Sequence, residues 1–235
     1  MKKAVCVVVG VGPGNGASLS RRFAREGYAL ALLSRTIGFS RELVKELGEE
    51  KARAYACDVT DPSAVRATFA EIVRDLGEVD VLVYNAGSGV WGNVEEISAE
   101  DFERTWRVNT LGALVASQQV IPAMRQKGRG TILFIGATAS TRGMPRTAAF
   151  APAKMAQRGL AESMARHLWP VGIHVALIVI DGVVDLPRTR QAMPDKPDSF
   201  FVRPDDVAAT AHWLAQQPRS AWSFEVVARP FGEKW

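Results

Sequence analysis

Short apolar runs alternate with segments of helical spacing along almost the whole chain, and this alternation limits the possible folds more than any other feature. The apolar runs cover 4–10, 28–34, 53–59, 79–85, 131–137, 173–180 and 222–228, and the helical segments cover 17–26, 62–76, 99–126, 147–169 and 204–216. Strands that are apolar throughout and separated by helices are typical of a parallel sheet covered on both faces. We therefore predict one α/β domain over residues 1–235, with a doubly wound sheet of seven strands.

Composition and charge argue against several other classes of protein. The chain of 235 residues is 47% hydrophobic and 23% charged, and no apolar run reaches the roughly 18 residues of a membrane span. The beginning, MKKAVCVVVGVG, has a faint likeness to a signal peptide, but its apolar part is too short and leads directly into a glycine-rich turn. We interpret it as a first buried strand of a cytoplasmic protein that contacts no membrane.

The net charge of +4 does not indicate a nucleic-acid-binding protein. The only local basic patch is Arg125, Lys127 and Arg129, and no aromatic residues are interleaved with it, so we interpret it as solvated surface. The two cysteines, Cys6 and Cys57, are expected to be small buried hydrophobic residues. No metal site is predicted.

A glycine-rich turn follows the first predicted strand. Gly10, Gly14 and Gly16 allow a tight turn, the close approach of a pyrophosphate and close packing of the next helix. Asn15 lies between the last two glycines, at the expected start of that helix. Because the turn follows a strand and opens a helix, it predicts a dinucleotide site at the carboxyl ends of the strands.

The second predicted strand ends without a carboxylate. An acidic residue there would bind the ribose 2′-hydroxyl of NAD, but the chain has Ser34 and Arg35, which suit a 2′-phosphate. We therefore predict NADP(H) as the cofactor. The alternative is that Arg35 is an arginine that only faces solvent.

These residues, together with three further motifs, resemble the short-chain dehydrogenase/reductase family along almost the whole chain. The motifs are the CDV segment, the NAG segment and the RVNTLG segment, which contain Asp58 and Val59, Asn85, Ala86 and Gly87, and Asn109. The resemblance implies a Rossmann-type sheet of order 3-2-1-4-5-6-7. It also implies that the cofactor is contacted by Asp58, Val59, Asn85, Ala86, Gly87, Lys154, Gly182 and Val184. In that order Cys6 and Cys57 lie on strands separated by a third, which excludes a disulfide between them.

The chain departs from the family at the catalytic positions. The family uses Asn, Ser, Tyr and Lys, but here Phe150 stands for the Tyr and Ala137 for the Ser, while Asn109 and Lys154 remain. Thr138 and Ser140 are nearby hydroxyls, although a slip of one residue turns a side chain to another side. The resemblance is closest to a subgroup that carries Phe for Tyr and keeps the Lys.

Asp181 replaces the proline that the family has after the sixth strand. One hypothesis makes it the proton donor, since desolvation would raise the pKa of its carboxyl. The other makes it a turn cap that accepts hydrogen bonds from nearby backbone amides.

Three functions are compatible with this set of residues. The first is an NADP(H)-dependent oxidoreductase whose proton comes from elsewhere, or whose small, apolar substrate needs none, such as an imine that binds already protonated. The second is a non-catalytic NADP(H)-binding sensor or partner subunit. The third is a fold reused for protein association alone, which would leave the glycine turn, Arg35 and Lys154 without a purpose.

Two further expectations concern the substrate side and the assembly. Residues 182–203 contain three prolines after a strand end, and we expect a loop on the substrate side, with a plain surface connection as the alternative. Trp91, Met144 and Phe150 suggest an apolar pocket. By resemblance, helices 99–126 and 147–169 pair with their symmetry mates in a homodimer or homotetramer through the apolar residues Leu111, Leu114, Val115, Leu160 and Met164.

Overall fold

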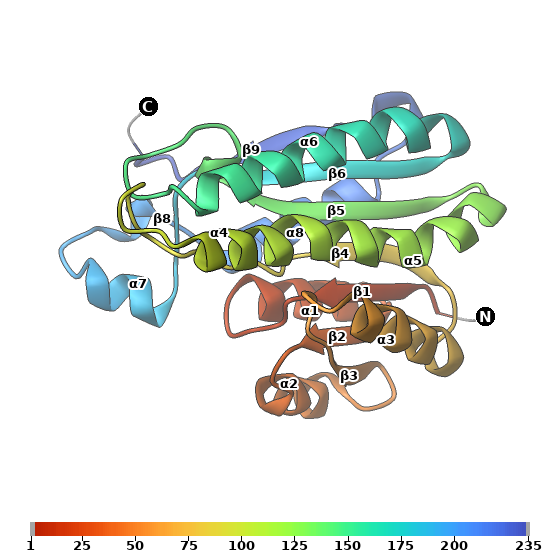
Figure 1. Ribbon diagram of the computed structural model, residues 1–235. Coiled ribbons are helices and arrows are strands. Elements are labelled where there is room, and N and C mark those ends of the chain that lie inside the picture. Colours follow the sequence, from red (N-terminus) through yellow and green to blue (C-terminus); the bar gives the residue numbers. More distant parts are fainter. Residues whose placement is uncertain (1–2, 234–235) are drawn as a thin grey trace.

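The computed structural model describes residues 3–233 and contains the predicted sheet of seven parallel strands. The strands lie in the order β3-β2-β1-β4-β5-β6-β9 (Figure 1). They are β1 (Val5–Val9), β2 (Ala29–Ser34), β3 (Ala52–Ala56), β4 (Val79–Tyr84), β5 (Gly130–Ala137), β6 (Ile173–Ile180) and β9 (Glu225–Ala228). The doubly wound fold and its strand order are therefore confirmed. The order reverses between β1 and β4, which is where such sheets open a crevice for a ligand.

Helices cover both faces of the sheet (Figure 1). One face packs against α3 (Pro62–Asp75), α5 (Gly112–Lys127) and α6 (Phe150–Leu168), and the other packs against α1 (Asn15–Arg25), α2 (Gly38–Leu47) and α8 (Pro204–Ala215). Every residue of β1 and β6 is buried. This explains why these strands are apolar throughout instead of alternating in polarity.

The predicted helix over 99–126 is interrupted. It consists of α4 (Ala99–Trp106), a π-helical turn (Arg107–Leu111) and α5. The buried side chain of Asn109 donates to the carbonyl of Thr105, 2.8 Å away, and to the carbonyl of Ser88, 2.9 Å away. These bonds to backbone carbonyls accompany the local widening of the helix, which turns Asn109 toward the β4 end of the sheet.

Two parts of the chain are more regular than the sequence predicts. The helix α2 was missed because only Ser40 and Leu43 are buried on it, so its apolar spacing is weak. The segment 182–203 is not an irregular loop: it contains β7 (Val183–Val184), α7 (Pro187–Ala192) and β8 (Phe201–Val202), and β7 pairs with β8. This segment projects beyond the carboxyl ends of the strands (Figure 1).

The helical faces also correct one expectation about assembly. Val115 and Met164 are buried in the core between the sheet and the helices, so they are not spare apolar surface. Leu111, Leu114 and Leu160 are half-buried. The exposed apolar side chains on α4 and α6 include Phe102, Trp106 and Met155.

Cys6 and Cys57 are buried free thiols; Cys6 lies on β1 and Cys57 directly follows β3, and β2 separates these two strands, as predicted. Between residues 3 and 233, none of the helices has the length and apolar character needed to cross a bilayer. The same residues include no group of His, Cys, Asp and Glu side chains that could hold a metal ion.

Candidate active site

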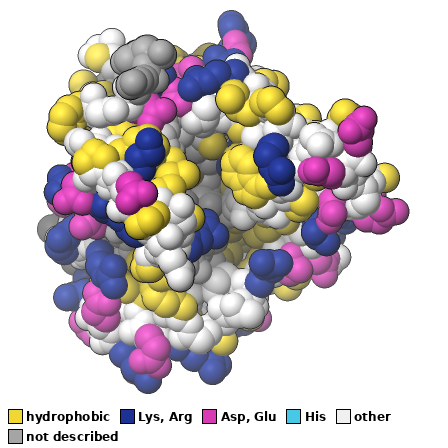
Figure 2. Space-filling model, turned by 90° about the vertical axis from the view of Figure 1, so that its left-hand side faces the viewer, with side chains coloured by type: hydrophobic (Ala, Val, Ile, Leu, Met, Phe, Trp, Pro, Cys, Tyr) yellow, Lys and Arg dark blue, Asp and Glu magenta, His cyan; other side chains and the backbone are white. Residues whose placement is uncertain are grey.

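A hollow of about 630 Å³ lies at the carboxyl ends of β1, β2 and β4. Figure 2 views the molecule onto this edge of the sheet and shows a depression bordered by basic and apolar side chains. Ten of the residues predicted to bind a cofactor line it: Gly10, Gly14, Asn15, Gly16, Ser34, Arg35, Val59, Asn85, Ala86 and Gly87. The fold thus gathers residues from four separate stretches of the chain around one cavity.

The glycine turn is shaped by contacts that a side chain would block. Gly10 has a φ of +91°, and a Cβ there would lie 2.4 Å from the backbone nitrogen of Ala86. A Cβ on Gly16 would lie 2.7 Å from the carbonyl oxygen of Gly10. The turn leads directly into the amino end of α1, where unpaired backbone N–H groups favour an anion. Within the described chain, the buried Oδ1 of Asn15 has no hydrogen-bond partner.

The NAG segment closes the neighbouring wall of the hollow. The side-chain amide of Asn85 donates to the carbonyl of Gly10 over 2.7 Å, which ties the end of β4 to the glycine turn. Gly87 is exposed and stands between this wall and the interior. A Cβ on Gly87 would lie 3.5 Å from Oδ1 of Asn109 and 3.9 Å from Nζ of Lys154. These two predicted catalytic residues therefore lie directly behind the wall of the hollow.

The end of β2 presents a cation. Arg35 is exposed on the lining of the hollow and forms no hydrogen bond or ion pair with any of residues 3–233. The hydroxyl of Ser34 is already engaged, since it bonds to the carbonyl of Thr36 and to the hydroxyl of Ser40. Arg35 is thus the group at this position that is available to a ligand.

Asp58 lies near Arg35 but is outside the residues that line the hollow. Its Oδ1 accepts from the backbone and the hydroxyl of Thr60, at 2.9 and 2.8 Å. The bond from the Thr60 backbone is the main cause that lowers the pKa of the Asp58 carboxyl, and the charge of Arg35 adds to it. Asp58 therefore forms a turn with Thr60, and its carboxylate lies at the edge of the site.

Lys154 and Asn109 meet behind Gly87. Nζ of Lys154 donates to the carbonyl of Ile135 over 2.8 Å and to Oε1 of Gln157 over 3.0 Å. Burial lowers the pKa of Lys154 to about 7. Oδ1 of Asn109 is fully buried and has no hydrogen-bond partner in the described part of the chain. An unused acceptor and a cation at the same wall suit a ligand that carries hydroxyl groups, such as a ribose.

Ala137 ends β5 and Phe150 begins α6, and neither has a hydroxyl. The ring of Phe150 packs on Trp91, with ring centroids 5.4 Å apart, and Trp91 is 60% exposed. The nearby hydroxyls are used within the chain, because Thr138 donates to Asp181 and Ser140 accepts from the backbone of Ala137. These two hydroxyls are therefore bonded within the chain, that of Thr138 as a donor and that of Ser140 as an acceptor.

Asp181 has side-chain partners that neither hypothesis for it names. Its side chain is only 5% exposed and accepts from Thr138 at 2.7 Å, from Arg142 at 2.9 Å and from Arg229. Burial by itself would raise the pKa of this carboxyl, but the bonds from Thr138, Arg229 and Arg142 outweigh burial and lower the pKa. Asp181 is therefore a carboxylate paired with two arginines, and the lowered pKa is opposite to the raised pKa that the proton-donor hypothesis assumes.

The segment 182–203 reaches the hollow through different residues from those predicted. Gly182 and Val184 do not line the hollow, whereas Leu186, Pro187 and Arg188 do. A Cβ on Gly14 would lie 2.6 Å from Cδ2 of Leu186, so this leucine lies against the glycine turn. No local pattern in the sequence indicates these contacts, since they join Gly14 to Leu186, which lies far along the chain.

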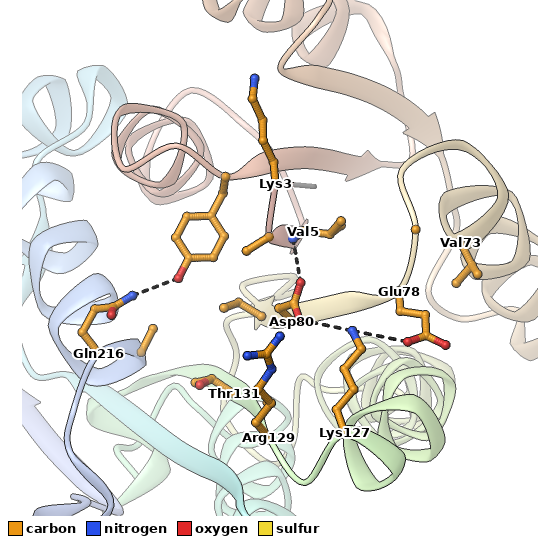
Figure 3. Close-up of a pocket in the computed structure, with 15 residues that line it drawn as sticks. Lys3, Val5, Val73, Glu78, Asp80, Lys127, Arg129, Thr131 and Gln216 are labelled. Carbon is orange, nitrogen blue, oxygen red and sulfur yellow. Dashed lines mark hydrogen bonds and ion pairs between the residues drawn. The ribbon is translucent and has the colours of Figure 1, made fainter. Parts of the chain in front are cut away.

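A second hollow, of about 830 Å³, lies at the opposite, amino-terminal edge of the sheet (Figure 3). Although larger, it is not the candidate site. Three of its ionic groups are bonded to one another: Lys127 bridges Glu78 and Asp80, and Asp80 also accepts from the backbone of Val5 (Figure 3). It has no glycine turn and no helix start, and it lies away from the edge where α/β sheets bind ligands.

The residues around the carboxyl-end hollow fit a dinucleotide. The glycine turn packs so closely that a Cβ at Gly10 or Gly16 would meet neighbouring backbone, the start of α1 faces the hollow, and Asn15 and Asn109 each offer an unused acceptor. The types and positions of these residues thus suit a dinucleotide along the whole length of the hollow.

Comparison with known proteins agrees with this geometry. A family model described as short chain dehydrogenase matches residues 4–196. A sepiapterin reductase of Chlorobaculum tepidum is 28% identical over 97% of this chain and 96% of its own length. A cyclic-di-GMP-binding biofilm dispersal mediator protein of Escherichia coli is 33% identical over 89% of this chain and 88% of its own.

Solved structures of the same fold have been determined with either nicotinamide cofactor. An alcohol dehydrogenase of Thermococcus sibiricus, in complex with 5-hydroxy-NADP, is 26% identical with a TM-score of 0.88, covering 99% of this chain and 98% of its own. A xylitol dehydrogenase with NAD⁺ bound is 26% identical with a TM-score of 0.84, covering 97% of this chain and 98% of its own. With a family match over most of its length, this chain belongs to the short-chain dehydrogenase/reductase family.

Proposed function

We propose that the protein is an NADP(H)-dependent oxidoreductase with an atypical active site. The observation that carries the proposal is the hollow itself, in which a glycine turn, a helix start and an unpaired arginine follow one another. Arg35 stands where an enzyme specific for NAD would have a carboxylate, so a 2′-phosphate would find a cation instead of an anion. The solved relatives were determined with either cofactor, so the preference rests on Arg35.

Each part of the site has a distinct task in this proposal. The glycine turn and α1 would bind the pyrophosphate, Arg35 the 2′-phosphate, and Lys154 and Asn109 the ribose next to the nicotinamide. Asp58 and Val59 would contact the adenine side. When bound, NADP(H) supplies or accepts the hydride, and the protein fixes its position relative to the substrate.

The substrate side differs from that of a usual carbonyl reductase, and in this it resembles the subgroup with Phe for Tyr. Phe150 and Ala137 offer no proton, and positioned acid–base catalysis contributes about 10²–10⁴ in rate. A substrate that needs no acid, such as an imine that binds already protonated, would avoid this loss. Trp91 and Phe150 provide an aromatic surface for a small apolar substrate, and the segment 182–203 would cover it.

A second candidate is a non-catalytic NADP(H)-binding protein on the same fold. The absence of both hydroxyls favours it, while the glycine turn and Arg35 are kept. The relative of Escherichia coli is named for binding a nucleotide and not for a reaction. In either case we propose a homodimer or homotetramer formed through α4, α5 and α6, whose exposed Phe102, Trp106 and Met155 offer apolar surface. Light scattering that gives a monomeric mass at micromolar concentration would overturn the assembly.

Fluorescence titration with NADPH and NADH tests the proposal. The unmodified protein should bind NADPH more tightly, and Arg35→Ala should weaken NADPH by roughly 10- to 150-fold, the value of a charged hydrogen bond, with little change for NADH. Arg188→Ala is the matched control, since Arg188 lines the hollow beside the glycine turn and should affect both cofactors alike. Equal affinities for the two cofactors would refute the NADP(H) preference, and no binding of either would refute the function.

A reductase screen then separates the two candidates. With NADPH bound, imines, ketones and activated alkenes are offered and the loss of NADPH absorbance is followed. Turnover of an imine supports the oxidoreductase. Tight NADPH binding without turnover of any class supports the binding protein.

A further inference from the structure

Gln157 is a buried amide that the sequence does not single out, and it connects the two family residues that remain at this site. It lies on α6, one turn after Lys154, and is fully buried. Its Oε1 accepts from Nζ of Lys154 at 3.0 Å, and its Nε2 donates to the backbone carbonyl of Asn109 at 2.8 Å. Because the Asn109 carbonyl can only accept, the amide has one orientation, with its oxygen toward the lysine.

Both charge states of Lys154 are satisfied by this arrangement. A neutral amine has two N–H groups, and the carbonyl of Ile135 and Oε1 of Gln157 accept both of them. An ammonium has a third N–H, and the remaining direction is toward Gly87 and the hollow, since Nζ lies 3.9 Å from the position of a Gly87 Cβ. The third N–H of Lys154, which only the charged form has, therefore faces the side where a ligand would bind.

Among residues 3–233, no carboxylate holds Lys154 in its charged form. Burial is the cause that lowers the pKa of Lys154 to about 7. The charged and titratable groups on the elements packed around it are engaged elsewhere: Tyr84 on β4 donates to the Val108 carbonyl, Asp181 after β6 pairs with Arg142 and Arg229, and Arg158 on α6 pairs with Glu225. A neutral amide is thus the strongest polar side-chain partner that this lysine has.

We propose that Gln157 positions Lys154 so that its nitrogen can release and regain a proton at the wall of the hollow, and that this proton replaces the one that neither Phe150 nor Ala137 can give. In the step, the N–H bond that faces the hollow breaks and the proton passes to the hydroxyl or water bonded to it there, which in turn gives a proton to an electron-rich atom of the substrate. The electron pair stays on nitrogen, and the resulting amine keeps its bonds to Ile135 and Gln157. Water then returns a proton. The proposal rests on the proposed oxidoreductase function for its last step only.

The titration of Lys154 in the cofactor-free full chain tests the positioning. The protein is labelled with ¹³C at lysine Cε, and Lys154→Met identifies the signal. We expect Lys154 to titrate near neutral pH, far below the other lysines. Gln157→Glu places a carboxylate beside the ammonium and should raise its midpoint by about 1–3 pH units, the effect of an opposite charge at this distance.

The matched control is Gln119→Glu on α5, a half-buried amide that donates to the carbonyl of Val115 and does not contact Lys154. It should leave the midpoint unchanged. Gln157→Met, which keeps the volume and removes the acceptor, should lower the midpoint and serves if the Glu variant does not fold. A Lys154 midpoint above pH 9, or one that neither Gln157 variant moves, would overturn the positioning role.

A substrate found in the reductase screen tests the proton step. The midpoint of the turnover-against-pH profile should move in Gln157→Glu by the same amount as the Lys154 signal, whereas a profile that does not move would remove Lys154 as the proton source. If NADPH does not bind at all while the Lys154 signal behaves as expected, the proposed function fails and the positioning by Gln157 stands.

Discussion

The two halves of the active-site edge differ in how closely they keep to the family pattern. At the ends of β1, β2 and β4, the glycine turn, Arg35 and the NAG segment surround a hollow that fits a dinucleotide. At the ends of β5 and β6, the polar side chains are Thr138, Asp181 and Arg142, and they are bonded to one another. We call these the nucleotide side and the reaction side.

The comparison shows that binding and reaction chemistry can change separately in one fold. The nucleotide side presents unused groups to a ligand, namely Arg35, the start of α1 and the Oδ1 atoms of Asn15 and Asn109. On the reaction side, partners within the chain already occupy the described hydroxyls and the carboxylate. A site that binds NADP(H) and lacks the usual acid is therefore a coherent arrangement, and each half can be altered without the other.

The largest expected effect comes from restoring the reaction side. Phe150→Tyr with Ala137→Ser adds the two hydroxyls, and ketone reduction should rise by about 10²–10⁴, the value of positioned acid–base catalysis. The rate of NADPH oxidation with a ketone measures it. Phe150→Tyr alone is the control and should give only part of the gain. If the double variant binds NADPH normally and stays inactive, the reaction side differs by more than two hydroxyls.

Removing the charge of Asp181 should lower the free energy of unfolding by about 3 kcal/mol. This value is the lower end of the range for a buried ion pair that loses one partner, and it is chosen because Arg142 is half exposed. Tm should fall by roughly 6–12 °C in Asp181→Asn. Asp198→Asn is the matched control, since Asp198 also pairs with an arginine but its side chain is 94% exposed. Equal shifts in the two variants would contradict the buried role of Asp181.

The same carboxylate predicts a direction with pH. The pKa of Asp181 is lower in the folded protein than in the unfolded chain, so its contribution to stability is present above about pH 4 and is lost as the pH falls through the folded pKa. The difference in Tm between the unmodified protein and Asp181→Asn should therefore shrink on acidification below pH 4. A difference that stays constant with pH would show that the charge is not the stabilising feature.

The smallest of these effects separates two neighbouring glycines on the nucleotide side. Gly10→Ala forces a left-handed backbone and a contact with Ala86, and should cost about 1–3 kcal/mol together with NADPH affinity. Gly12→Ala lies in the same turn with no atom within 4 Å of its new Cβ, and should be tolerated. Thermal unfolding and NADPH titration measure both. Similar losses would mean that the turn is sensitive everywhere, and not only where the backbones meet.

The sequence predicts the nucleotide side better than the reaction side for a physical reason. A glycine turn between a strand and a helix is a local feature, and its position along the chain determines its geometry. The partners of Asp181 lie at Thr138, Arg142 and Arg229, which are brought together only by the order of the strands. Burial alone therefore predicts a raised pKa for Asp181, whereas the bonds from Thr138 and the two arginines lower it. The bond of Gln157 to Asn109 and the contact of Leu186 with Gly14 are likewise made between distant parts of the chain.

The ionic contacts of Asp181 also bear on the order in which the protein is completed during synthesis. Every part of the nucleotide-side wall up to Gly87 is made before the midpoint of the chain, so it can assemble early. The reaction side needs Arg229, which follows β9, and β9 pairs with β6 at the far edge of the sheet. Until that last strand docks, Asp181 is a carboxylate at an open sheet edge with one of its two cations missing. A ribosome-bound chain should therefore form its glycine turn well before the ion pairs of Asp181 on the reaction side.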